Sequence, residues 1–205
     1  MQVIEFKVNK KKKGSCISAI SLVDEPAVLV DFLKLNAEKV EIKLSVNEDK
    51  MIITGPALIP NQKIYRTAQS LGLEEDGYIF FSAETISEMA NMFMSNELQN
   101  VITLDHETPN SDLKLLESWV SLDSEKDKSA ALGFNLPAGT WYLTYAVNNV
   151  DLWKQIKAGK LNGFSIEASG FDRTLIEMAK ETEEEITEDE FAEYIFNRIK
   201  AIVVH

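Results

Sequence analysis

Thr140-Trp-Tyr-Leu-Thr-Tyr-Ala-Val147 decides the fold class, because aromatic and β-branched residues alternate along it as they do in a long strand of a sheet. The same period of two marks the stretches Met1–Val8 and Val40–Val46. Apolar runs predict further strands over 51–59, 101–104, 114–121 and 161–168. Gly55-Pro56 interrupts the first of these runs, which predicts a bend or bulge. The chain is therefore predicted to be mostly β.

One segment changes to the helical period of 3.6 residues. Between Ser82 and Ser95 the apolar residues at i, i+3, i+4 and i+7 are Ile86, Met89, Ala90 and Phe93. This spacing predicts an amphipathic helix with one face in the core. Thr85 and Glu88 offer a capping box near its start.

A second, shorter helix is predicted from Asp151, a residue type that caps helices, to Gly159, which suits the carboxy-terminal position. Its apolar side chains would be Leu152, Trp153 and Ile156. Helices inserted at intervals into a mostly β chain indicate an α+β fold. We expect a mostly antiparallel β-barrel or strongly curved sheet surrounded by helices.

The last thirty or so residues differ from the rest of the chain in composition. Residues 177–193 are rich in Asp and Glu and contain one basic residue, Lys180, which predicts a solvated linker. A helix with an apolar stripe of Phe191, Ile195 and Ile199 is predicted to follow. We therefore divide the 205 residues into one folded domain, 1–175, and an acidic linker with a carboxy-terminal amphipathic helix, 176–205.

Composition and charge exclude several classes of protein. The 33 acidic and 21 basic residues give a net charge of −12, which opposes non-specific binding to nucleic acid. The single cysteine, Cys16, excludes an intrachain disulfide and a four-cysteine zinc site, and it suits a reducing compartment. No apolar run approaches the ~20 residues of a membrane helix. Residues 1–13 do not resemble a secretory signal, so we expect a soluble cytoplasmic protein.

Histidine is scarce, and this limits the choice of a catalytic base. His205 is the last residue, where fraying is expected, so His106 in Leu104-Asp-His-Glu-Thr108 is the candidate. Neighbouring residues of a strand point to opposite faces, so Asp105, His106 and Glu107 are not expected to bind one metal ion. An exposed structural histidine is the alternative.

Ser165 in Gly163-Phe-Ser-Ile-Glu167 is the candidate nucleophile. It lies two residues after a glycine at the start of a predicted strand, but the Gly-x-Ser-x-Gly pattern of α/β-hydrolases is absent. A serine needs a base to become nucleophilic, and His106 is the base that the chain offers. From the residues alone, this pairing rests on the scarcity of histidine in the chain.

An ordered series of short motifs resembles the XkdF-like phage serine proteases, which are grouped with the prohead proteases of tailed phages. The resemblance covers roughly 20–170. The motifs are Ser21-Leu-Val-Asp-Glu-Pro-Ala27, Gly55-Pro-Ala-Leu-Ile-Pro60, Leu104-Asp-His-Glu107, Glu117-Ser-Trp-Val120, Gly139-Thr-Trp-Tyr142, Asp151-Leu-Trp-Lys-Gln-Ile-Lys-Ala-Gly159 and Gly163-Phe-Ser-Ile166. The resemblance implies that 1–175 is a protease domain with a fold similar to the herpesvirus assemblins.

The resemblance also implies roles for particular residues. His106 is expected to be the general base and Ser165 the nucleophile. We expect Glu117 to orient His106 after a hairpin return, with Glu167 and Asp172 as alternatives. Backbone N–H groups near Ser165, assisted by Arg173, are candidates for the oxyanion hole. Acyl transfer of this kind requires no cofactor and no metal.

By the same resemblance, the protein is expected to act in the host cytoplasm, inside the phage prohead. Its substrates would be scaffold and major capsid proteins as well as the protease itself, and a homodimer is plausible. Neither nucleic acid nor a membrane is an expected partner. The alternatives are a catalytically silent, protease-like scaffold or assembly protein and an unrelated soluble binding module.

Overall fold

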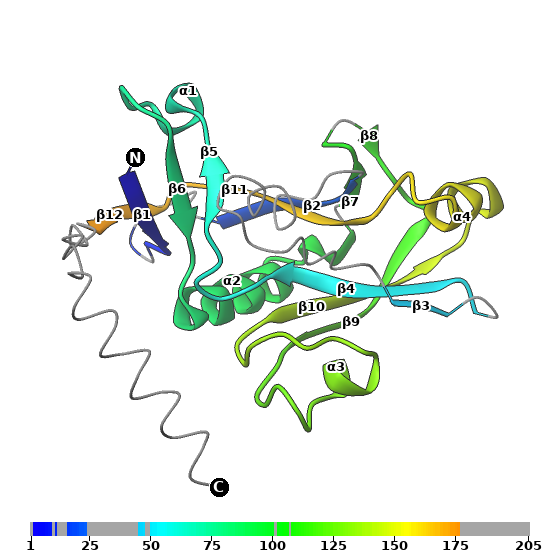
Figure 1. The fold of residues 1–205 in the computed structure, drawn as a ribbon. Coiled ribbons are helices and arrows are strands. Elements are labelled where there is room, and N and C mark those ends of the chain that lie inside the picture. Colours follow the sequence, from blue (N-terminus) through cyan, green and yellow to red (C-terminus); the bar gives the residue numbers. More distant parts are fainter. Residues whose placement is uncertain are drawn as a thin grey trace, which may run out of the picture.

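The structure is a computed structural model that describes residues 2–9, 11, 16–23, 45–47, 50–100, 102–106 and 108–176. Within these residues, strands form three four-stranded sheets accompanied by helices (Figure 1). The predicted α+β class is therefore confirmed. The predicted barrel or strongly curved sheet is not confirmed, because the described strands belong to separate sheets and form no closed barrel. The predicted linker and helix after 176 lie outside the described residues.

The three sheets combine strands that are far apart in the sequence. The first has the order β12 (Asp172–Ile176), β1 (Gln2–Lys7), β6 (Gly77–Phe80) and β5 (Ile64–Arg66). The second has the order β3 (Ser45–Asn47), β4 (Ile52–Leu58), β10 (Trp141–Val147) and β9 (Leu113–Val120). The third has the order β11 (Gly163–Ser169), β2 (Cys16–Val23), β7 (Ile102–Leu104) and β8 (Thr108–Pro109).

The described helices are short apart from one. They are α1 (Ala68–Leu71), α2 (Ala83–Ser95), α3 (Lys128–Ala131), α4 (Val150–Lys157) and the 3₁₀ turn η2 (Leu98–Asn100). The longest, α2, packs against β2 of the third sheet and against β9 and β10 of the second (Figure 1). Within the described ranges, no helix has both the length and the apolar character needed to span a bilayer.

β10 is the central strand of the hydrophobic core. Its fully buried side chains are Trp141, Tyr142, Leu143 and Tyr145, so the strand is covered on both faces. The ring centroid of Trp141 lies 5.5 Å from that of Phe93 on α2. The ring of Tyr145 lies 5.5 Å from that of Phe164 on β11. Aromatic contacts therefore connect β10 both to α2 and to the strand that carries Ser165.

The bend predicted at Gly55-Pro56 is confirmed as an irregularity in the pairing of β4 with β10. Trp141 is opposite Leu58 and Tyr142 is opposite Pro56, so Ala57 has no partner in the register. A proline has no N–H to donate to a sheet ladder, and a bulge is one of the positions that tolerates it.

The predicted amphipathic helix corresponds to α2, and its apolar positions are buried as expected. Its start differs from the prediction. Ser82 is the N-cap, with extended backbone, and its hydroxyl oxygen accepts a hydrogen bond from the Thr85 N–H at 3.3 Å. Thr85 is therefore the third residue of the helix rather than its cap, since the first turn begins at Ala83.

The predicted short helix corresponds to α4, with Leu152, Trp153 and Ile156 buried. Asn149, and not Asp151, is its N-cap. The Asn149 side-chain oxygen accepts hydrogen bonds from the N–H groups of Asp151 and Leu152 at 2.9 and 3.0 Å. Asp151 instead lies in the first turn, where its negative charge interacts favourably with the helix dipole.

Gly139 provides a test of the packing between the β10 sheet and α2. Its φ is +88°, and an added Cβ would lie 2.7 Å from the Cβ of Ala83 at the start of α2. We expect Gly139→Ala to lower the free energy of unfolding by about 2 to 4 kcal/mol, through overpacking and backbone strain.

Gly133→Ala is the matched control for this experiment. Gly133 has a φ of +87°, but nothing lies within 4 Å of an added Cβ. Its substitution should cost only the backbone strain, about 1 to 2 kcal/mol. Urea denaturation of both variants measures the difference, and equal losses would show that the Ala83 contact contributes nothing.

Candidate active site

The candidate site lies on one face of the third sheet, where β2 is paired on both sides. β2 runs antiparallel to β11, with Ser21 directly opposite Ser165. It runs parallel to β7, with Ser21 aligned to Thr103. Residues aligned across neighbouring strands project from the same face of a sheet. Ser165, Ser21 and Thr103 therefore share a face, although more than 140 residues of sequence separate the first two.

Glu167 joins this face because it lies two residues after Ser165 on β11. Its Oε1 accepts hydrogen bonds from the hydroxyls of Ser21 and Thr103, at 3.1 and 3.2 Å. The same oxygen lies 3.0 Å from Nδ1 of His106. One carboxylate oxygen is thus the meeting point of side chains from β11, β2, β7 and the turn after β7.

His106 is held by a turn with unusual backbone geometry. Asp105 and His106 follow β7 with φ values of +47° and +62°, which is the left-handed region. This region is uncommon for residues other than glycine, although Asp and His tolerate it better than most. The Asp105 N–H donates to the carbonyl of Leu22 on β2 at 3.1 Å, which ties the turn to the sheet. Backbone strain of this kind is concentrated at functional sites.

The electrostatics of Glu167 favour its ionised form. Partial burial by itself raises the pKa of Glu167, but hydrogen bonds from His106, Ser21 and Thr103 outweigh it. The pKa therefore lies below its usual value of 4.5. At neutral pH this carboxylate is an acceptor only, so the His106 Nδ1 that faces it carries the proton. In the neutral ring that arrangement leaves Nε2 with a free lone pair, which is the form a general base needs.

Ser165 lies on the same face but is not bonded to the histidine. Its exposed fraction is 9%, and among the described residues its hydroxyl makes no hydrogen bond to His106. Ser165 also lines a cavity of about 490 Å³ between β11 and the first sheet. The hydroxyl is therefore close to a space that a ligand can enter.

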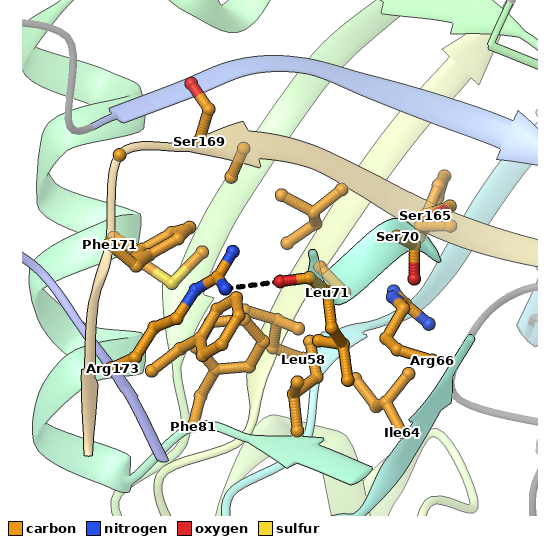
Figure 2. Close-up of a pocket in the computed structure, with 18 residues that line it drawn as sticks. Leu58, Ile64, Arg66, Ser70, Leu71, Phe81, Ser165, Ser169, Phe171 and Arg173 are labelled. Carbon is orange, nitrogen blue, oxygen red and sulfur yellow. Dashed lines mark hydrogen bonds between the residues drawn. The ribbon is translucent and has the colours of Figure 1, made fainter. Parts of the chain in front are cut away.

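Figure 2 shows this cavity, with Ser165, Arg66 and Ser70 toward one end and Phe171 and Arg173 toward the other. Most of the residues that line it are of apolar type, including ones from β4, β5, β6, α2 and β11. Arg173 donates a hydrogen bond from Nη1 to the carbonyl of Leu71, drawn as the dashed line (Figure 2). Its guanidinium also lies 5.5 Å from the ring centroid of Phe6. Among the described residues, the charged ones that line the cavity are Arg66 and Arg173.

The structure does not bring Glu117 to His106, which corrects the expected position of this carboxylate. Glu117 is on β9 in the second sheet, and Lys128 at the start of α3 forms an ion pair with it. The hydrogen bond from Lys128 holds the pKa of Glu117 below its usual value. The hairpin expected after His106 does form, but it returns as β8 and not as the strand of Glu117.

Asp172, the other alternative, lies in the first sheet and not beside His106. It begins β12, and its carboxylate accepts a hydrogen bond from the Asn9 side chain at 3.0 Å. Of the three acidic candidates, the residue in contact with His106 is Glu167.

Comparison with known families adds independent information. A family model described as "Putative phage serine protease XkdF" matches residues 39–174. This range contains Ser165, His106 and Glu167 and covers more than half of the chain. The chain belongs to this family.

As a member of the XkdF phage serine protease family, the protein is assigned a protease function in general. No curated protein and no solved structure matched the chain. Among the described residues, no group of three or more His, Cys, Asp or Glu side chains is arranged to hold a metal ion.

Ser21 and Thr103 are site residues that sequence reasoning missed. Ser21 begins one of the motifs that resemble the family, but it lies before the matched range, and nothing in its neighbourhood indicates a contact with position 106. Thr103 is one polar residue in an apolar strand. A single hydroxyl in the middle of an apolar strand could have indicated a buried hydrogen bond, since a buried polar group needs a partner.

The lowered pKa of Glu167 predicts how its contribution to stability depends on pH. Stabilisation by the ionised carboxylate is fully present above pH 4.5, its unfolded pKa, and is lost as the pH falls through the lower folded value. We expect Glu167→Gln to reduce the free energy of unfolding at pH 7, with the difference from wild type shrinking below pH 4.5.

Urea denaturation at a series of pH values measures this difference. Glu74→Gln, which removes an exposed carboxylate in the loop after α1, is the control and should show no such trend. A Glu167→Gln difference that stays constant between pH 7 and pH 3 would contradict the assigned hydrogen bonds.

Proposed function

We propose that the protein is a serine endopeptidase that cleaves scaffold and capsid proteins, and itself, during maturation of a phage prohead. The observation that carries the proposal is the pair formed by His106 Nδ1 and Glu167 Oε1, 3.0 Å apart, on the sheet face that also carries Ser165. Nucleophile, base and orienting acid are the three parts that acyl transfer by a serine requires. Membership of a phage serine protease family supports the reaction class.

The chemistry assigns one task to each side chain. Ser165 Oγ attacks the peptide carbonyl while His106 Nε2 accepts the hydroxyl proton. The C–N bond then breaks, and the same proton passes to the leaving amine. Glu167 stabilises the imidazolium that exists between these two steps. A water molecule, activated by His106, finally hydrolyses the acyl-enzyme and restores the serine hydroxyl.

The cavity beside Ser165 supports binding of a peptide segment. It is about 490 Å³, within the range of ligand sites, and it offers both apolar side chains and polar groups to a substrate. Within the described residues β11 is an edge strand, paired only with β2. Backbone N–H groups along that free edge are candidates for the oxyanion hole, and Arg173 lines the same cavity.

A catalytically silent, protease-like assembly protein is the second candidate. The observation that favours it is the absence of a Ser165–His106 hydrogen bond among the contacts of the described residues. Catalytic hydrogen bonds are often formed only once substrate is bound, so this geometry is compatible with an enzyme.

The proposed site of action is the interior of the prohead in the host cytoplasm, and the proposed assembly is a homodimer.

The experiment that tests the function is co-expression with the scaffold and major capsid proteins of the same phage, followed by intact mass spectrometry. Wild type should produce defined fragments. Ser165→Ala and His106→Ala should each reduce the cleavage rate on the order of 10⁴-fold, because the serine–histidine pair acts as a unit. Glu167→Gln should reduce it less than either.

Glu117→Gln is the matched control, because it removes a carboxylate that pairs with Lys128 in a different sheet. Its cleavage rate should stay within about twofold of wild type. Fragments that persist unchanged in Ser165→Ala would exclude the proposed nucleophile. The absence of cleavage by wild type in assembled proheads would favour the silent assembly protein.

A further inference from the structure

Two buried hydroxyls lie beneath the His106–Glu167 pair, and the proposed reaction assigns them no task. Ser21 is fully buried and Thr103 is 9% exposed. They come from β2 and β7, and their oxygens are hydrogen-bonded to one another. A buried hydroxyl that lacks a partner is costly, so two of them arranged around one carboxylate oxygen form a built polar network.

The protons available limit the donors and acceptors of this network. Each hydroxyl has one proton to donate, and an ionised carboxylate only accepts. The hydroxyls of Ser21 and Thr103 lie 3.1 and 3.2 Å from Glu167 Oε1 and also contact each other, so their two protons are shared among three contacts, and the Nδ1–H of His106 supplies a further donor to the same oxygen. Ser21 Oγ also lies 3.1 Å from Nδ1, so it contacts both members of the pair.

Ser21 is not placed to act as a nucleophile itself. Its side chain has no exposed surface, whereas Ser165 lines the cavity. It faces Nδ1 of His106, the nitrogen that is already committed to Glu167. A base that activates a nucleophile must use a nitrogen with a free lone pair, which is Nε2 here.

We propose that Ser21 and Thr103 are positioning residues that hold the Glu167 carboxylate against Nδ1 of His106, and thereby keep Nε2 free and correctly aimed. This inference rests on the proposed protease function. Both hydroxyls contact the same Glu167 oxygen that faces the imidazole, and Ser21 Oγ also lies 3.1 Å from Nδ1, so neither the carboxylate nor the ring needs to reorganise when the imidazolium forms. Because Ser21 is on β2, before the matched range of 39–174, the amino-terminal strand is part of the site.

The test uses the full chain and a fluorophosphonate probe. Attack by Ser165 Oγ forms an O–P bond, the P–F bond breaks, fluoride leaves and His106 takes the proton. Intact mass gives the labelling rate as a function of pH. We expect Ser21→Ala and Thr103→Val each to slow labelling by about 10-fold to 100-fold, since each removes a hydrogen bond to a charged group.

Two further variants separate positioning from stability. Thr103→Ser keeps the hydroxyl and should restore labelling to within about threefold of wild type. Thr54→Val removes a hydroxyl from another buried pair, Thr54 with Thr144 at 3.0 Å in the second sheet, and should leave labelling within about twofold. The proposal would be overturned if Thr54→Val and Thr103→Val slowed labelling equally, or if Ser21→Ala did not slow it. A label found on Ser21 would also overturn it.

A carboxyl titration distinguishes failure of this inference from failure of the proposed function. Carbon-13 NMR of the Glu167 side chain measures its pKa without any reaction, and the pKa should rise in Ser21→Ala and Thr103→Val but not in Thr54→Val. If wild type is not labelled while the pKa rises, the protease function fails and the hydroxyl network is retained. An unchanged pKa in both variants refutes the network whether or not the protein is active.

Discussion

The pairing of β2 with two strands that are distant in sequence is the constraint on which the rest of the site depends. β2 is antiparallel to β11 and parallel to β7, so Ser21 lies between Ser165 and Thr103 on one face. A parallel pair needs a long crossover connection, and the chain between β2 and β7 contributes β3 and β4 to the second sheet and β5 and β6 to the first. The site is thus assembled by long-range pairing, and a register slip of one residue on β2 would turn Ser21 to the opposite face.

A single carboxylate oxygen then organises the candidate site. Glu167 Oε1 receives hydrogen bonds from the imidazole and from two hydroxyls, which keeps it ionised despite partial burial. The desolvation penalty of a partly buried charge is offset only when its hydrogen bonds are well made. That requirement explains why the hydroxyls are at aligned positions of neighbouring strands, and why the strained turn at His106 is tied to β2 through Leu22.

The core supports this arrangement from the opposite face of β11. Phe164, adjacent to Ser165, points away from the polar face and packs against Tyr145 of β10. Because alternate residues of a strand face opposite sides, the same strand anchors itself in the core through Phe164 and presents Ser165 and Glu167 to the site. The cavity along β11 reaches Ser165, the proposed nucleophile, from the side of the first sheet.

The sequence by itself determined the features that depend on local pattern or on residue type. The 3.6-residue period of α2 and the bulge at Gly55-Pro56 follow from neighbouring residues. The prediction of His106 and Ser165 as candidate base and nucleophile comes from the scarcity of histidine and from family motifs. Only the tertiary structure decided that Glu167 and not Glu117 contacts His106, and that Ser21 and Thr103 support the pair. The reason is physical: Glu117 was expected there from a local hairpin, whereas the actual contacts arise from strand pairings across 61 or more residues, which no local pattern encodes.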